Sequence, residues 1–230
     1  INSDGSGERR VMAGNLMKSP AWSPDGQRIV FSWQRGGQEP RELCDPRVGC
    51  FILPADPYWR LAYVDLATGE SDHVASEVHS FNPHWEPGGS RILYAGDRGL
   101  YLTEMEGKSR LLLETANPVR NPVWSPDGQR IALQMRLHDH WDIFVLNANG
   151  SGLQPLTQSS PLAERAANNV APAWSPDGRH IAFLSDRDGA WRLYVMRSDG
   201  TAQRPLAPKV LADITFRYDF AAERVVDWTP

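Results

Sequence analysis

His138, Asp139 and His140 are the densest group of potential metal ligands in the 230-residue chain, and Trp141 follows them directly. Imidazole nitrogens and carboxylate oxygens are the ligands of many zinc sites. Three consecutive residues rarely bind one ion, because successive side chains of an extended strand point to opposite sides. The pattern favours the tip of a solvated hairpin, and we predict no metal and no cofactor.

A serine hydrolase needs a nucleophile on a strained turn, a base and an oxyanion hole. The sequence contains no Gly-x-Ser-x-Gly motif that would supply such a nucleophile. The two aspartates of the Asp-Arg-Asp-Gly segment at 186–189 are ordinary turn chemistry, since Asp-Gly is typical of turns. We therefore predict that this chain is not an enzyme.

A pentapeptide that recurs four times organises the elements that must position these side chains. It reads Trp-Ser-Pro-Asp-Gly at 22–26, 124–128 and 174–178 and Trp-Glu-Pro-Gly-Gly at 85–89, and an isoleucine follows each tryptophan by seven residues. Proline cannot donate to a sheet ladder, and the Asp-Gly pair tolerates a tight turn. Each copy therefore predicts a hairpin between two antiparallel strands.

Further strands give each repeat four in all. Second strands are predicted at 28–33, 91–94, 130–134 and 179–184, third strands at 59–65, 100–104, 141–147 and 191–197, and short fourth strands at positions such as 153–157 and 203–206. Trp85 and Trp124 lie 39 residues apart, and the spacing of 63 residues from Trp22 to Trp85 contains an irregular 24-residue loop insertion at 34–57. Four-stranded units of this size are typical of propeller blades.

These features predict an all-β protein, a β-propeller in one domain at 1–230. It has four complete blades of four antiparallel strands plus a partial or composite fifth, and the tryptophans pack between blades. Residues 1–7 resemble 146–152, so the chain opens within a blade, and either Trp228 or Tyr218 marks a further unit near the end. The two ends either pair as a closing blade or belong to a longer ring of five or six blades.

The composition is that of a soluble globular protein, with 41% hydrophobic residues, 23% charged residues and a net charge of −4. No basic run is interleaved with aromatic residues, so we expect no nucleic-acid partner. No apolar run reaches the length of a membrane span, so we expect no direct membrane insertion. Cys44 and Cys50 share the 34–57 insertion, and we favour a disulfide over two free cytoplasmic thiols. A disulfide predicts a periplasmic or extracellular protein.

The recurring pentapeptide, the isoleucine that follows it and the Asn-Ala-Asn-Gly-Ser-Gly turn at 147–152 resemble the TolB-type propeller repeats, a family similar to WD repeats. The resemblance spans nearly the whole chain. It implies a binding module in or beyond the bacterial envelope, where TolB itself joins a complex with a peptidoglycan-associated lipoprotein. Other members gate serine peptidases or act as sensor domains, so the resemblance is specific for the fold and not for one activity.

Binding is expected on one face of the propeller, because every long or irregular connection falls there, at 34–57, 137–140, 158–171 and 208–223. We call it the elaborated face. Arginine and aromatic side chains are enriched at recognition surfaces, although part of any such set is ordinary solvated rim. The candidate partner-binding residues are Arg35, Tyr58, Trp59, Arg98, Arg120, His138, His140, Trp141, Arg187 and Trp191.

Our leading hypothesis is a non-enzymatic recognition or scaffold domain that binds a protein or cell-envelope polymer through the elaborated face. The alternative is an accessory propeller, gating or sensing, whose partners are other domains of a larger peptidase or signalling protein. A third hypothesis, a sugar lyase with loop-borne histidine and arginine around a metal, requires an ion bound through His138 and His140.

Overall fold

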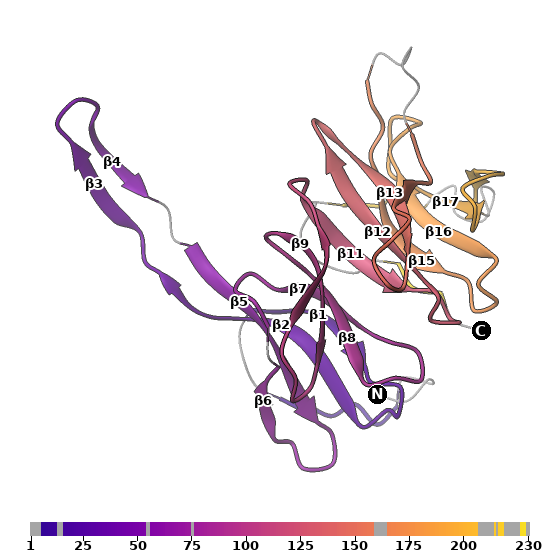
Figure 1. The fold of residues 1–230 in the computed structure, drawn as a ribbon, viewed down its shortest axis with the longest axis horizontal. Coiled ribbons are helices and arrows are strands. Elements are labelled where there is room, and N and C mark those ends of the chain that lie inside the picture. The colour runs from indigo at the N-terminus through magenta and orange to yellow at the C-terminus, as the bar shows by residue number, and fades with distance from the viewer. Residues whose placement is uncertain are drawn as a thin grey trace.

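The computed structural model describes residues 6–12, 16–53, 56–74, 76–158, 165–206, 214, 216–218 and 226–228. Every regular element in these ranges is a β strand. Across the same ranges, no helix has the length and apolar character needed to cross a membrane. The prediction of an all-β protein is confirmed (Figure 1).

Four sheets of four antiparallel strands form the body of the molecule and confirm the four predicted blades (Figure 1). Blade 1 consists of β1 (Met17–Trp22), β2 (Arg28–Gln38), β5 (Asp56–Asp65) and β6 (Ser71–His73), and blade 2 of β7 (Phe81–Trp85), β8 (Arg91–Gly96), β9 (Gly99–Glu104) and β10 (Arg110–Glu114). Blade 3 consists of β11 (Val119–Trp124), β12 (Arg130–Leu137), β13 (His140–Asn147) and β14 (Gln154–Pro155), and blade 4 of β15 (Asn169–Trp174), β16 (His180–Ser185), β17 (Arg192–Arg197) and β18 (Arg204–Pro205).

The recurring pentapeptide forms a hydrogen-bonded turn between the first two strands of each blade. In blade 3 the Ser125 hydroxyl donates to Asp127 Oδ1 at 2.6 Å and accepts the backbone N–H of Arg130 at 2.9 Å. Asp127 Oδ1 also accepts the N–H of Gln129 at 3.0 Å, and the bond from Ser125 is the main reason that the pKa of Asp127 is lowered. Gly128 has a φ of +67°, which favours glycine.

Three of the four repeat tryptophans pack between blades, as predicted. Trp85, Trp124 and Trp174 are buried, and each lies in a cluster with apolar side chains of the preceding blade. The prediction is wrong for Trp22, which is 62% exposed. Each tryptophan needs a preceding blade as its partner, and no described strand precedes blade 1.

The first strands of successive blades, β1, β7, β11 and β15, contact one another in order around the central axis. Each strand has a bulge at the residue three positions before its tryptophan, where φ is about +50° and a proline follows. These residues are Ser19, Asn82, Asn121 and Ala171.

A chain of buried hydrogen bonds joins the blades at these bulges. Asn82 donates to the Ser19 hydroxyl at 3.0 Å and accepts the backbone N–H of Asn121 at 3.2 Å. The Asn121 amide donates to Gln134 Oε1 at 3.0 Å, and the same oxygen accepts the Ala171 N–H at 2.8 Å. These contacts connect all four blades through side chains that are almost fully buried.

The described parts of the chain ends cover the two outer faces of the blade series. Val11 and Met12 pack on blade 1, whereas Phe216 and Tyr218 pack on blade 4. The Tyr218 hydroxyl also reaches Asn121 at 3.1 Å. Most of the segments predicted to form a closing blade lie outside the described residues, so that prediction stays open. Neither Tyr218 nor Trp228 lies in a strand.

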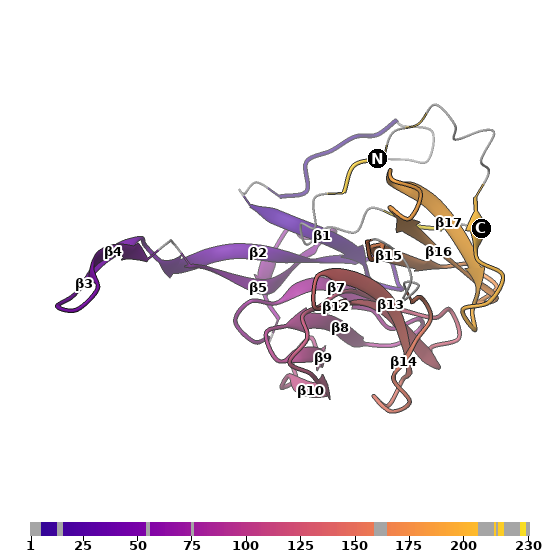
Figure 2. The same ribbon diagram turned by 90° about the horizontal axis from the view of Figure 1, so that it is seen from above.

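Most described residues of the 34–57 insertion lie in strands, which corrects the prediction of an irregular loop. β2 extends to Gln38, and β3 (Arg41–Asp45) and β4 (Gly49–Leu53) form a hairpin that leads back to β5. This β3–β4 hairpin, which we call the arm, projects away from the four blades (Figures 1 and 2). The sequence predicted a loop here because the arm packs against no second sheet. Its residues therefore do not alternate between buried apolar and exposed polar side chains.

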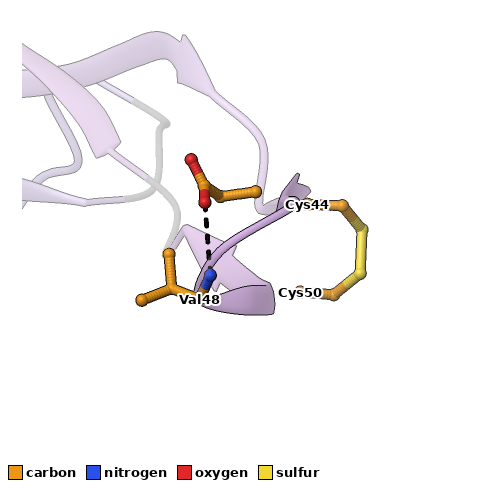
Figure 3. Close-up of a disulfide and its surroundings, with 4 residues drawn as sticks. Cys44, Val48 and Cys50 are labelled. Atoms are coloured by element: carbon orange, nitrogen blue, oxygen red, sulfur yellow. Dashed lines mark hydrogen bonds between the residues drawn. A yellow bond between two sulfur atoms is a disulfide. The ribbon is translucent and has the colours of Figure 1, made fainter.

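The predicted disulfide is present in the arm, where Cys44 and Cys50 are directly opposite residues of β3 and β4 (Figure 3). Asp45 Oδ1 closes the turn by accepting the backbone N–H groups of Arg47 at 2.7 Å and Val48 at 3.2 Å. The connection at 137–140 is also shorter than predicted, because Leu137 and His140 pair directly across a tight turn. This tight turn confirms the hairpin interpretation of the His138 region.

Replacing Gln134 with leucine should lower the free energy of unfolding by about 1–3 kcal/mol, because buried donors on Asn121 and Ala171 lose their acceptor. Urea unfolding followed by tryptophan fluorescence measures the change. Gln129→Leu on the exposed turn is the matched control and should change stability by less than about 0.5 kcal/mol. Equal effects of the two variants would show that the axial network contributes nothing specific.

Candidate recognition surface

The candidate residues fall into three areas of the elaborated face. Arg35 lies at the base of the arm, Tyr58, Trp59 and Arg120 lie where blades 1, 2 and 3 meet near the axis, and a third group lies between blades 3 and 4. The third group comprises His140, Trp141, Arg187 and Trp191. Arg98 lies in the β8–β9 turn of blade 2, and the exposed His138 lies at the β12–β13 turn with a φ of 49°.

Arg35 lies beside a cleft between the arm base and blade 2. Its guanidinium is 5.0 Å from the centre of the Trp33 ring, and Trp33 stacks on His73. The cleft has a volume of about 610 Å³, and Arg35, Arg60 and His73 are among its lining residues. The cleft therefore presents two arginine side chains beside an aromatic stack.

Aromatic rings connect two cations near the axis. The Lys18 ammonium lies 5.8 Å from the centre of the Trp59 ring, and Trp59 contacts Phe81 at a ring separation of 5.9 Å. The Arg120 guanidinium lies 4.6 Å from the centre of the Phe81 ring. Tyr58 contacts the His79 ring at the margin of this group. The arrangement combines positive charge with flat apolar surface.

Asp142 is the centre of the group between blades 3 and 4, and it is almost fully buried. Its Oδ1 accepts the Thr157 hydroxyl at 2.6 Å and the Asn169 amide at 2.9 Å, while Oδ2 lies 3.2 Å from His140 Nε2. Burial is the largest influence on this carboxyl and raises its pKa, which the three polar contacts oppose. Asp142 therefore joins blade 3 to blade 4.

Arg187 extends this network and is held by contacts within the chain. Its guanidinium donates to Asn169 Oδ1 at 2.7 Å, to Ser185 Oγ at 2.9 Å and to Gln203 Oε1 at 2.9 Å. It also lies 4.5 Å from the centre of the Tyr194 ring. Burial lowers the pKa of Arg187. Arg187 is thus an exposed residue whose guanidinium is held by other side chains of blade 4.

The remaining candidates, Trp141, Trp191 and Arg98, differ in how far they are exposed to solvent. Trp141 and Trp191 are half-buried and pack in the cluster that contains Tyr218, with the rings of Trp191 and Tyr218 5.4 Å apart. Arg98 pairs with Glu114 at 2.6 Å in full contact with solvent, a type of ion pair that contributes little stability.

His140 Nδ1 lies 3.0 Å from Asp139, so both ring nitrogens of His140 face carboxylates. Within the described ranges, Glu42, Cys44 and Cys50 are the one group of three whose potential ligand atoms come together, and both cysteines are in the disulfide.

Asp142, Asn169 and Lys18 belong to these groups, and the sequence interpretation did not select them. The sequence does offer a clue to Asp142, because this aspartate directly precedes the apolar residues of β13 and lies in the buried part of that strand. Lys18, Phe81, Arg120 and Val170 occupy one repeat position, four residues before the tryptophan of each blade. Comparing the repeats position by position would have identified this site.

The geometry agrees with a direct comparison of sequences. The TolB beta propeller domain matches residues 58–210, more than half of the chain. The chain belongs to the TolB β-propeller family. The predicted resemblance is confirmed by this match and by the solved structures below.

Members of this family occur in proteins of different kinds. A protein TolB homolog of Chlorobium chlorochromatii is 31% identical over 124 residues, which are 51% of this chain and 23% of that protein. The uncharacterized peptidase YuxL of Bacillus subtilis is 34% identical over 126 residues, which are 51% of this chain and 17% of that protein. The matched stretch covers less than a quarter of either relative.

The structure of TolB from Acinetobacter baumannii has the same fold. It superposes with a TM-score of 0.63 at 19% identity, and the match covers 84% of this chain and 44% of that one. At this identity the likeness shows the propeller architecture alone.

Asp142→Asn should remove a pH dependence of stability. Burial raises the pKa of Asp142 above its unfolded value, so the folded state favours the protonated carboxyl, and stability is lost as pH rises from about 4 through the raised pKa. Asparagine keeps the acceptor for Thr157 and Asn169 without the charge. Relative to the wild type, the variant should gain stability between pH 4 and pH 7 in urea unfolding experiments.

Asp142→Ala is the matched comparison, since it removes the acceptor at every pH. Relative to Asp142→Asn, its free energy of unfolding should be lower by about 1–3 kcal/mol throughout the pH range. Because His140 faces the same carboxyl, the pH series is repeated in a His140→Gln background. A constant difference between Asp142→Asn and the wild type across the range would contradict the assignment.

Proposed function

We propose that this propeller is a non-enzymatic recognition domain of a periplasmic or extracellular protein, and that it binds a protein partner of the cell envelope through the elaborated face. The observation that carries the proposal is the arm, which exposes apolar side chains to solvent on a disulfide-linked hairpin. The family membership supports the compartment, since TolB homologues are among the relatives.

The arm has the properties of a contact element. Val48 at its turn is 80% exposed and Ile52 is 71% exposed. Leu43 and Phe51 are opposite residues of β3 and β4, share one face of the hairpin and are each exposed by more than a third. Grouped apolar side chains on a projecting element are typical of protein–protein interfaces and not of an unbound surface. The arm therefore offers apolar contacts on both of its faces, because Ile52 follows Phe51 in β4 and points to the other side.

The disulfide explains how the arm keeps its shape without a core. A two-stranded hairpin is only marginally stable in water when it packs against nothing. The bond between Cys44 and Cys50 holds the two strands together near the turn. A bond of this kind persists in an oxidising compartment, which is consistent with the proposed location.

An accessory role in a larger protein is the second candidate, and the relative YuxL favours it because that protein is described as a peptidase. In this case the elaborated face would contact another domain of the same polypeptide. Both candidates use the same surface, and they differ in whether the contacted protein is a separate chain.

Site-specific photocrosslinking in the cells that produce the protein tests the proposal. A benzophenone side chain at position 48 should form an adduct with a separate envelope protein, and Ile52→Asp in the same protein should abolish it. The same probe at position 129, on a turn of the opposite face, should give no adduct. Crosslinks confined to the protein's own polypeptide would establish the accessory role, and equal adducts from positions 48 and 129 would contradict both candidates.

Opening the disulfide should loosen the arm and leave the blades intact. In a Cys44→Ser and Cys50→Ser double variant, trypsin should cut at Arg47 several times faster than in the wild type, because the free hairpin frays. Mass spectrometry of timed digests measures this rate. The thermal unfolding midpoint of the blades should stay the same, and a large drop would mean that the arm contributes to the propeller core.

A further inference from the structure

Arg120 differs in its partners from three other arginines of the elaborated face, Arg98, Arg165 and Arg187. Arg98 is paired with Glu114, Arg165 with Asp186 and Arg187 with three side chains. Arg120 is half-buried, and within the described residues its guanidinium makes one hydrogen bond, to the backbone oxygen of Val119 at 2.8 Å, and no ion pair. Most of its five donors are therefore available to a ligand.

The position of this guanidinium is set by the fold. Arg120 comes from β11, directly before the axial bulge at Asn121, and its charged group lies over the Phe81 ring of the neighbouring blade. An aromatic face stabilises a cation electrostatically without using its hydrogen-bond donors. Phe81 thus holds the guanidinium in place and leaves its N–H groups open.

Among the residues that the structure describes, little negative charge lies near Arg120. Burial is the largest influence on its pKa and lowers it, and Asp97 is the carboxylate that acts in the opposite direction. Asp97 is itself bonded to His79 at 2.8 Å. Lys18 occupies the same repeat position in blade 1 and adds a second positive charge near the axis. A carboxylate placed beside this guanidinium would add the charge-assisted hydrogen bonds that its described surroundings do not supply.

We propose that Arg120 binds the carboxylate of a ligand at the elaborated-face end of the central axis, with Phe81 and Trp59 as the flat apolar surface beside it. The planar fork of a guanidinium matches the two oxygens of a carboxylate. Phe81 and Trp59 suit the planar or apolar group to which that carboxylate is attached. The site goes beyond the proposed protein contact at the arm, and it does not depend on that contact.

Two sources of a carboxylate share this chemistry, namely the end of a peptide and an acidic sugar. The probes are hippurate, which has a peptide-like carboxylate on an aromatic acyl group, and galacturonate. Hippuramide, which lacks the charge, is the matched control for the first probe. Isothermal titration of the purified full chain at low salt measures the binding, and the stronger of the two probes identifies the source.

The expected result is millimolar or tighter binding of one carboxylate probe and none of hippuramide. Arg120→Met keeps the apolar contact with Phe81 and should weaken binding by at least about tenfold, the effect of losing a charged hydrogen-bonded contact. The same variant should be as stable as the wild type or more stable, because a half-buried charge is removed. Arg179→Gln, on an exposed turn of the opposite face, should leave binding unchanged.

Three outcomes would overturn the assignment. They are the absence of binding by both carboxylate probes, equal binding of hippurate and hippuramide, and binding that survives Arg120→Met. A loss of stability in Arg120→Met together with absent binding would show instead that Arg120 is a packing residue. None of these outcomes bears on the crosslinks from the arm, so the two proposals fail separately.

Discussion

Stacking of each blade on the next is the interaction on which the rest of this structure depends. The second strands β8 and β16 are buried at every position after their first residue, so both faces of these sheets need cover. A single sheet cannot cover both of its own faces, and the neighbouring blades do so. Trp124 and Trp174 are parts of these interfaces, whereas Trp22, which no described strand precedes, is exposed.

Polar contacts near the axis depend on this stacking. The bulges bring Asn82, Asn121 and Gln134 close enough for the Asn82 and Gln134 side-chain oxygens to accept N–H groups of Asn121 out of water. Unpaired amides in this position would cost stability, so the network restricts how the blades can rotate against each other. The same restriction places Phe81 under Arg120 and Asn169 beside Asp142.

The stacking also separates the parts of the chain that hold the fold from the parts that are free to vary. The turns formed by the recurring pentapeptide bond to themselves, as Ser125 and Asp127 show, and they leave the connections on the other face unconstrained. The connection between β2 and β5 contains the arm, whose apolar side chains lie outside every blade interface. An element of this kind contributes nothing to the core, and its exposed apolar surface is the reason that we propose a partner contact there.

The sequence by itself determined the repeat, the four blades, the positions of their strands and the pairing of Cys44 with Cys50. These features are local, since a Pro-Asp-Gly turn and an alternating or apolar run act over a few neighbouring residues. The sequence did not predict the arm as a hairpin. Neither face of the arm is covered, so its strands lack the alternation of apolar and polar residues that marks a half-buried strand. Only the tertiary structure decided that Asp142 meets Asn169 and that Arg120 lies over the Phe81 ring. Those contacts cross from one blade to the next, and the distance between residues such as Phe81 and Arg120 depends on how whole sheets pack.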